Sequence, residues 1–348
     1  MDHRLSRVSA ALVAFGLSAC GPGGAGGDDF PPGAPDAGTP PGRQPDAHPP
    51  AGADAAPPDA GASIRDRCFP GLGDPAKGLP DYDQFGTVVG AHCDGTNHQD
   101  ITGVDKVVFL GDSITEGTPP NTPAQYYRNL LTERLRGKFG ADLEMAECSN
   151  WGARTDDLLM PPHDQVRACF PGVEPRRTLV VMTMGGNDMH AILKDALAGD
   201  TLDESMAKVD QAVALLRATL DWFRADPARF PAGVFVVFAN VYEFTDAVGD
   251  FPHSCPAAVL DGITRGWPEG RPVFIRLNEE LVRAAVETGT DAMFLSERFC
   301  GHGFHSDDPD NECYRGPGTE RWFDLTCIHP NPAGHQAIAE AFFHVIDE

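Results

Sequence analysis

Apolar runs rich in β-branched residues alternate along the chain with segments whose apolar residues recur at helical spacing. Two of the runs, TLVVMTM and GVFVVFAN, are almost continuously apolar, which is typical of strands buried on both faces of a parallel sheet. The pattern predicts strands at 104–110, 143–148, 178–184, 233–240 and 291–295. It predicts the main helices at 122–138, 202–225, 276–288 and 332–346.

Strands that alternate with helices predict an α/β fold. We expect three layers, α/β/α, built on a flavodoxin-like, five-stranded parallel sheet, because consecutive parallel strands need helical crossovers. In such sheets the ligand binds beyond the carboxyl ends of the strands. Candidate chemistry is therefore to be sought where the predicted strands end.

The first 64 residues lack this alternation. Residues 1–20 carry two arginines and then an apolar run of about ten residues, which is typical of an export signal and half the roughly 20 residues that a membrane span needs. Their end, LSAC, resembles a bacterial lipobox and predicts a lipid anchor on Cys20, with an ordinary secretory signal as the alternative. Residues 21–64 are rich in Pro, Gly, Ala and Asp, which predicts a disordered spacer before a folded domain at 65–348.

The formal net charge is −24, and the first 65 residues contribute little of it, with seven Asp against four Arg. Such an acidic domain disfavours binding to nucleic acid or to anionic membranes. We expect contact with a membrane only through the anchor at Cys20, and we expect a monomer. No cofactor is indicated.

Eight cysteines follow Cys20, at positions 68, 93, 148, 169, 255, 300, 313 and 327. An even number in an exported chain predicts disulfides, and the absence of any CxxC spacing disfavours a zinc site. The sequence does not determine the connectivity. As a first hypothesis we pair them in order, as 68–93, 148–169, 255–300 and 313–327.

Three of the predicted strands end in residues that suit acyl transfer. The first runs into GDSITEG, the second into CSNWG and the third into MGGND, while IHPN lies just before the final helix. Acyl transfer needs a hydroxyl nucleophile, a base to take its proton, and hydrogen-bond donors aimed at the developing oxyanion. Ser113 and His329 supply the first two, and Gly152 and Asn187 are candidate donors.

These four motifs, in this order, resemble the SGNH (GDSL) hydrolase superfamily of serine esterases and lipases, over about residues 104–347. The resemblance implies that Ser113 is the nucleophile and His329 the base. It also implies an oxyanion hole made by the Ser113 and Gly152 backbone N–H groups and the Asn187 side chain. Asp112 and Asp188, which flank these residues, are expected to hold loops by accepting backbone N–H bonds.

The chain departs from the family at the acid that orients the histidine. Family members usually carry Asp three residues before the His, and this chain has Thr326 there. Asp324 is the nearest carboxylate and our first candidate. The alternatives are the Thr326 hydroxyl or a main-chain carbonyl, which would make a Ser–His dyad, or an acid from the loop that holds Asp307, Asp308 and Asp310.

The segment from Cys300 to Cys313 has two interpretations. Its His and Asp residues are possible cation ligands, but their spacing matches no calcium loop, so we favour a disulfide-closed polar loop at the rim of the site. The prediction from the whole chain is an exported serine hydrolase of carboxylic esters, on a small molecule or a polymer. The alternative is a non-catalytic glycan-binding module on the same fold. Acyl lipids and acetylated glycans are not distinguished.

Overall fold

The computed structural model describes residues 62–72, 79–260 and 262–348. The predicted signal at 1–20 and most of the predicted spacer at 21–64 lie outside these residues. Within them, no helix is both long enough and apolar enough to cross a lipid bilayer.

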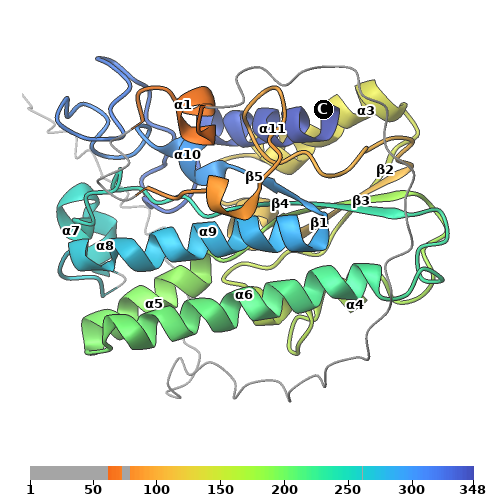
Figure 1. Cartoon of the computed structure of the whole chain (residues 1–348), viewed down its shortest axis with the longest axis horizontal. Helices are drawn as coiled ribbons and strands as arrows, with labels where there is room; N and C mark the ends of the chain where they lie inside the picture. Colours follow the sequence, from red (N-terminus) through yellow and green to blue (C-terminus); the bar gives the residue numbers. More distant parts are fainter. Residues whose placement is uncertain (1–61, 73–78, 261) are drawn as a thin grey trace, which may run out of the picture.

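A single sheet of five strands forms the centre of the domain (Figure 1). Every pairing is parallel, and the order is β2-β1-β3-β4-β5. The strands are β1 (Lys106–Gly111), β2 (Glu144–Glu147), β3 (Thr178–Thr183), β4 (Val234–Ala239) and β5 (Asp291–Met293). This is the order of a flavodoxin-like sheet, so the predicted fold class is confirmed. Its topological switch point, where such folds bind ligands, lies between β1 and β3.

Helices cover both faces of the sheet (Figure 1). On one face lie α3 (Tyr127–Phe139) and α11 (Pro332–Asp347), and on the other lie α5 (Gly186–Ala198), α6 (Leu202–Arg224) and α9 (Arg271–Thr288). All six residues of β1 and of β3 are buried, as their apolar sequences predict. The three predicted layers are therefore present.

The helices differ from the predicted ones mainly at their ends. A 3-10 turn, η3 (Pro123–Gln125), precedes α3, and α9 begins at Arg271, because Pro272 suits a first helical turn. Sequence reasoning missed α5, whose first residues belong to the Gly-Gly-Asn-Asp motif. The shorter helices are α1 (Ile64–Cys68), α2 (Ser113–Glu116), α4 (Gln165–Cys169), α7 (Phe251–Ser254), α8 (Pro256–Leu260) and α10 (Leu295–Phe299), with 3-10 turns η2 (Asp83–Phe85), η4 (Thr155–Leu158) and η5 (Pro268–Gly270).

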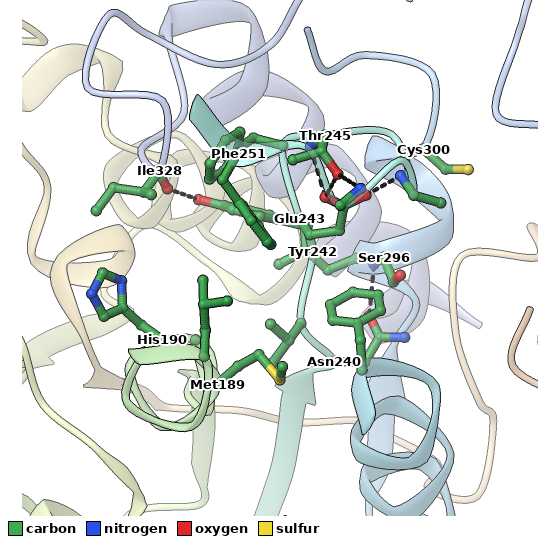
Figure 2. Close-up of a pocket in the computed structure, with 18 of the residues that line it drawn as sticks. Met189, His190, Asn240, Tyr242, Glu243, Thr245, Phe251, Ser296, Cys300 and Ile328 are labelled. Carbon is green, nitrogen blue, oxygen red and sulfur yellow. Dashed lines mark hydrogen bonds between the residues drawn. The ribbon is translucent and has the colours of Figure 1, made fainter. Parts of the chain in front are cut away.

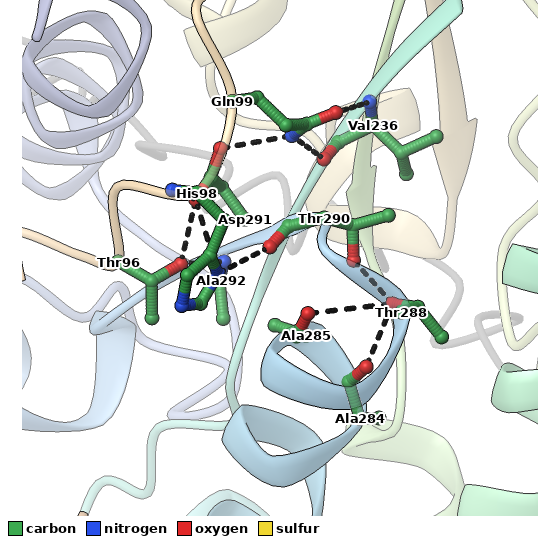
Figure 3. Close-up of polar contacts among 10 residues, drawn as sticks. All are labelled: Thr96, His98, Gln99, Val236, Ala284, Ala285, Thr288, Thr290, Asp291 and Ala292. Atoms are coloured by element: carbon green, nitrogen blue, oxygen red, sulfur yellow. Dashed lines mark hydrogen bonds and ion pairs between the residues drawn. The ribbon is translucent and has the colours of Figure 1, made fainter. Parts of the chain in front are cut away.

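Two glutamine side chains complete the hydrogen bonding of strands whose neighbours are too short. Gln165 donates to the carbonyl and accepts from the N–H of Gly111, both at 2.8 Å, where β2 no longer pairs with β1. Gln99 does the same for Val236 of β4, which lies ahead of the first residue that pairs with β5 (Figure 3). Each amide satisfies buried backbone groups that would otherwise cost stability.

The segment that contains Gln99 also binds the outer strand β5 (Figure 3). Thr96 donates its backbone N–H to Ala292 and its hydroxyl to Asp291, and its hydroxyl oxygen accepts the Ala292 N–H. His98 contacts the Thr290 carbonyl through Nδ1, at 2.8 Å. The chain that precedes β1 is thereby fixed along the edge of the sheet.

Four disulfides join parts of the domain, and half of the predicted pairing is correct. Cys68–Cys93 and Cys148–Cys169 are as expected. The pairs 255–300 and 313–327 are wrong, because the chain forms Cys255–Cys327 and Cys300–Cys313 instead. The 300–313 loop closes on itself, whereas Cys255, between α7 and α8, is brought to the loop that carries His329 by the tertiary fold.

Candidate active site

Ser113 is the first residue of α2 and follows β1 directly. Asp112 caps this short helix by accepting the Ile114 N–H at 3.0 Å, and the Thr183 hydroxyl of β3 donates to the same carboxylate at 2.9 Å. Gly111 has a φ of 137°, and a Cβ there would collide with the Thr183 carbonyl. The turn that presents Ser113 therefore requires glycine.

His329 lies on the loop before α11 and is only 5% exposed. Its chain neighbours are held from outside the loop: Tyr242 donates to the Ile328 carbonyl at 2.7 Å, and Asn121 donates to the Pro330 carbonyl at 2.8 Å. Asn331 caps α11 by accepting the Gly334 N–H. These contacts fix the backbone on both sides of the imidazole.

A continuous chain of hydrogen bonds runs through the imidazole. His329 Nε2 is 2.9 Å from Ser113 Oγ, and Nδ1 is 2.9 Å from Thr326 Oγ1. The Thr326 hydroxyl donates to Asp324 Oδ1 at 2.6 Å, and the Thr326 N–H donates to the same oxygen at 2.8 Å. The Asp324 carboxylate therefore contacts Thr326 and not the imidazole.

The turn between Asp324 and His329 explains this arrangement. The Asp324 N–H donates to the His329 carbonyl at 2.9 Å, and the Cys327 N–H donates to the Asp324 carbonyl at 3.2 Å. Cys327 adopts a φ of 75°, so the turn is tight, and its disulfide to Cys255 fixes it. Thr326, at the centre of the turn, lies between the carboxylate and the ring.

Burial shifts the pKa values of His329 and Asp324, the two titratable groups in this series of hydrogen bonds. It lowers the pKa of His329 to about 4, because the desolvated imidazolium is disfavoured. It also raises the pKa of Asp324, against the opposing effect of the Thr326 hydrogen bonds. The residues of the acidic loop, Asp307, Asp308 and Asp310, are exposed and do not contact the ring.

Of the candidate oxyanion donors, Asn187 faces the same cavity as Ser113. Asn187 stands in the first turn of α5, and its Nδ2 donates one hydrogen to the Ala153 carbonyl at 2.9 Å. An amide nitrogen carries two hydrogens, so the second is available to a ligand. Gly152, next to Ala153, has a φ of 75°, which favours glycine. Asn187 and Ser113 line the same cavity, whereas Gly152 is exposed and is not among the lining residues.

Asp112 and Asp188 hold loops, as predicted. Asp188 accepts the Thr155 N–H at 3.1 Å and the Thr155 hydroxyl at 2.8 Å, which fastens the loop after β2 to α5. Burial raises the pKa of Asp112 and that of Asp188 to about 6, although their hydrogen bonds act in the opposite direction.

A cavity of about 470 Å³ opens next to Ser113, Asn187 and His329 (Figure 2). Its walls come from α5, the loop after β4, the segment that contains α7 and α8, and the start of α9. In Figure 2, Met189 and His190 of α5 lie opposite Phe251 and Tyr242. His190, which directly follows the Gly-Gly-Asn-Asp-Met stretch, therefore lies at the cavity.

Sequence reasoning missed several residues that shape the site. Gln165, Asn121 and Tyr242 hold the backbone near Ser113 and His329, but each lies outside a motif and gave no signal. The cavity wall formed by α7 and α8 was also missed, because these short helices have too few turns to show a periodic pattern. Among the described residues, no group of three or more His, Cys, Asp or Glu side chains is arranged to hold a metal ion.

The parallel sheet, with a hydroxyl–imidazole pair at the switch point, defines a carboxylic ester hydrolase of the α/β/α class. The chain belongs to the GDSL-like lipase/acylhydrolase family, whose sequence profile matches residues 109–337. That match spans every predicted site residue. A comparison with curated protein sequences gave no match.

Several solved structures resemble the chain at low sequence identity. A protein described as a GDSL-like lipase from Parabacteroides merdae is 16% identical, with a TM-score of 0.48 over 71% of this chain and 98% of that one. An acetylxylan esterase from Geobacillus stearothermophilus is 16% identical, with a TM-score of 0.44 over 72% and 97%. The esterase EstA from Pseudoalteromonas sp. is 14% identical, with a TM-score of 0.41 over 70% and 97%. None is similar enough to assign a substrate.

Proposed function

We propose that this protein is an exported serine ester hydrolase in which Ser113 attacks the ester carbonyl and His329 takes the serine proton. The alkoxide oxygen bonds to the carbonyl carbon, and the tetrahedral intermediate then expels the alcohol, which receives the proton from His329. Water, deprotonated by the same imidazole, releases the acid from the acyl-enzyme. The observation that carries the proposal is the 2.9 Å contact between Ser113 Oγ and His329 Nε2.

Thr326 and Asp324 set the tautomer of the imidazole. The single Thr326 hydroxyl proton is directed at the Asp324 carboxylate, so Oγ1 has only lone pairs left to offer the ring. Nδ1 must then carry the ring proton and donate it to Thr326. Nε2 is left unprotonated, which is the state that accepts the Ser113 proton. A Ser–His–Thr–Asp chain thus replaces the direct carboxylate that is usual in the family.

The oxyanion is stabilised by the Ser113 and Gly152 N–H groups and by the free Asn187 amide hydrogen. Asp188 and the Ala153 carbonyl hold the Gly152 loop and Asn187 in fixed relation before substrate arrives. Such preorganised donors need no rearrangement as charge develops, and losing one typically costs on the order of 3 kcal/mol in barrier height.

The test uses Ser113→Ala on a short-chain nitrophenyl ester and on a fluorophosphonate label. We expect loss of turnover by several orders of magnitude and no labelling. Ser205 is buried on α6, outside the cavity, and its hydroxyl donates to the Thr201 carbonyl, so Ser205→Ala removes a hydroxyl of the same kind and should keep both activities. Labelling that persists in Ser113→Ala would refute the assignment of the nucleophile.

Export and lipid anchoring at Cys20 belong to the same proposal. The export-type first 20 residues support it, and so do the four disulfides, since such bonds persist in oxidising compartments. Metabolic labelling with a radioactive fatty acid should mark the wild-type protein and not Cys20→Ser. A protein found in the membrane fraction without the label would contradict the anchor.

A further inference from the structure

The interior of the cavity beside Ser113 is hydrocarbon-like. Apolar side chains line it from the catalytic residues to the N-terminal segment, with Met189 and Leu193 on α5 and Phe251, Ala257 and Trp267 on the opposite wall. Other apolar lining residues are Phe69, Leu72, Leu79, Met184, Val241, Phe244, Ala258, Ile263, Phe274, Ile275 and Leu295. Surfaces of this kind favour hydrocarbon over a hydrated ligand.

The polar side chains in this wall are already bonded to the protein. Asn240 donates to Tyr82 and Glu297 and accepts the Ser296 N–H, as Figure 2 shows in part. Glu297 also accepts the Tyr82 hydroxyl, at 2.7 Å. A sugar ring would need partners for its hydroxyls, and these groups would have to break internal bonds to supply them.

Glu243, the second carboxylate of the wall, is engaged in the same way. It accepts the Thr245 N–H and hydroxyl and the Ala247 N–H, so both oxygens are occupied (Figure 2). Burial raises the pKa of Glu243, which further weakens it as a charged ligand. The hydrogen-bonding capacity of Asn240, Glu297 and Glu243 is therefore used within the protein.

The cavity is much larger than an acetyl group. Taking roughly 30 Å³ for each carbon-sized unit, an acetyl group fills only about an eighth of the 470 Å³. An octanoyl or decanoyl chain fills about half or more by the same measure. A small acyl group would leave apolar surface in contact with water or empty space.

Exposed apolar side chains also lie next to the catalytic residues in the chain. Leu325 is 86% exposed between Asp324 and Thr326, and Ile328, which precedes His329 and lines the cavity, is 41% exposed. Trp151, before Gly152, is 42% exposed. Apolar side chains held in water beside a reaction centre suit an apolar substrate.

We propose that the substrates are esters of medium- to long-chain aliphatic acids, with the acyl chain in the cavity bounded by α5 on one side and by α7, α8 and the start of α9 on the other. The alcohol portion then leaves toward the exposed rim that carries Ile328. This inference rests on the proposed acyl-enzyme mechanism at Ser113. It excludes acetylated polysaccharides as the preferred substrates, because their acyl group is too small for the cavity.

The first test is a series of nitrophenyl esters from acetate to dodecanoate, kept below their aggregation limits. Each buried methylene is worth at most about fourfold in kcat/KM, so octanoate should exceed acetate by about a hundredfold or more. A maximum at acetate, together with release of acetate from acetylated xylan, would overturn the inference. Fluorophosphonate labelling of Ser113 in the same sample separates that result from failure of the mechanism, since an unlabelled serine overturns both.

The second test fills the cavity. Ala257 is partly buried in the wall, so Ala257→Phe should lower the octanoate-to-acetate ratio of kcat/KM by about tenfold or more. Ala141→Phe, at an exposed turn before β2, adds the same ring away from the cavity and should keep the wild-type ratio. An unchanged ratio in a folded Ala257→Phe protein would place the acyl chain elsewhere. The wild-type ester series decides the question even if that variant does not fold.

Discussion

Replacing Thr326 by valine is the sharpest test of how the imidazole is oriented. Valine keeps the shape of threonine and removes only the hydroxyl that links His329 Nδ1 to Asp324 Oδ1. The buried Nδ1–H then loses its acceptor, whereas Asp324 keeps the backbone N–H of residue 326. An unsatisfied buried donor costs about 1–3 kcal/mol, and more when the ring becomes charged in the transition state.

The loss of this hydrogen bond should lower kcat and leave the affinity for the substrate nearly unchanged. We expect kcat to fall by roughly 5- to 150-fold, because 1.4 kcal/mol corresponds to a factor of ten, with little change in KM. The upper limit is the loss of about 10⁴ that follows when a catalytic histidine takes the wrong tautomer. The assay is steady-state hydrolysis of a nitrophenyl ester, with thermal unfolding measured alongside to verify the fold.

Asp324→Asn is the paired variant. Comparing its loss of kcat with that of Thr326→Val shows which of the two residues acts directly on the imidazole. The amide oxygen of the Asp324→Asn side chain still accepts the Thr326 hydroxyl, so the tautomer is kept and only the charge assistance is lost, for a decrease of about tenfold or less. A larger loss in Asp324→Asn than in Thr326→Val would mean that the carboxylate acts directly on the ring. Near wild-type turnover in both variants would show that the hydrogen bonds from His329 through Thr326 to Asp324 do not orient the imidazole.

Three further outcomes follow from the structure. Burial lowers the pKa of His329 to about 4, so the imidazole stays neutral in mild acid. As the pH is lowered, kcat/KM should therefore fall with a midpoint near pH 4. A midpoint at or above pH 6.5 would contradict this. Gln165→Ala removes two buried hydrogen bonds from Gly111, whose carbonyl still accepts the Asn150 N–H, and should lower the unfolding free energy by about 1–3 kcal/mol in denaturant titrations. The exposed Gln336→Ala should lower it by about 0.5 kcal/mol or less. Removing the Cys255–Cys327 disulfide, which spans 72 residues, should cost about 4 kcal/mol and also lower kcat, which a purely structural bridge would leave unchanged.

The fold could be predicted because its central strands, β1 and β3, are buried along their whole length. Runs such as 178–184 and 233–240 are almost continuously apolar, which is typical of a covered parallel sheet. The candidate site residues were predicted for another reason: the motifs at the strand ends match a family, and the parallel sheet brings those ends to one edge. Local sequence patterns therefore predict both the layered fold and the edge of the sheet at which the candidate site lies.

The partner of His329 could not be derived in the same way. Asp324 was the expected contact, but the tight turn at Cys327 places Thr326 between the carboxylate and the ring, and that turn depends on a disulfide to a distant segment. The two wrong disulfide pairs and the unpredicted cavity wall have the same origin. Each depends on tertiary contacts between loops, and such contacts produce no periodic pattern in the sequence.

The Gln99 side chain has a consequence for how the molecule behaves among its copies. An outer strand with unpaired N–H and C=O groups is a template on which another chain can add a strand. Gln99 occupies those groups on β4 ahead of the start of β5, and Thr96 occupies them on β5 itself. The segment that precedes β1 thus blocks strand addition at this edge, and a chain shortened to begin after Gln99 should aggregate through it.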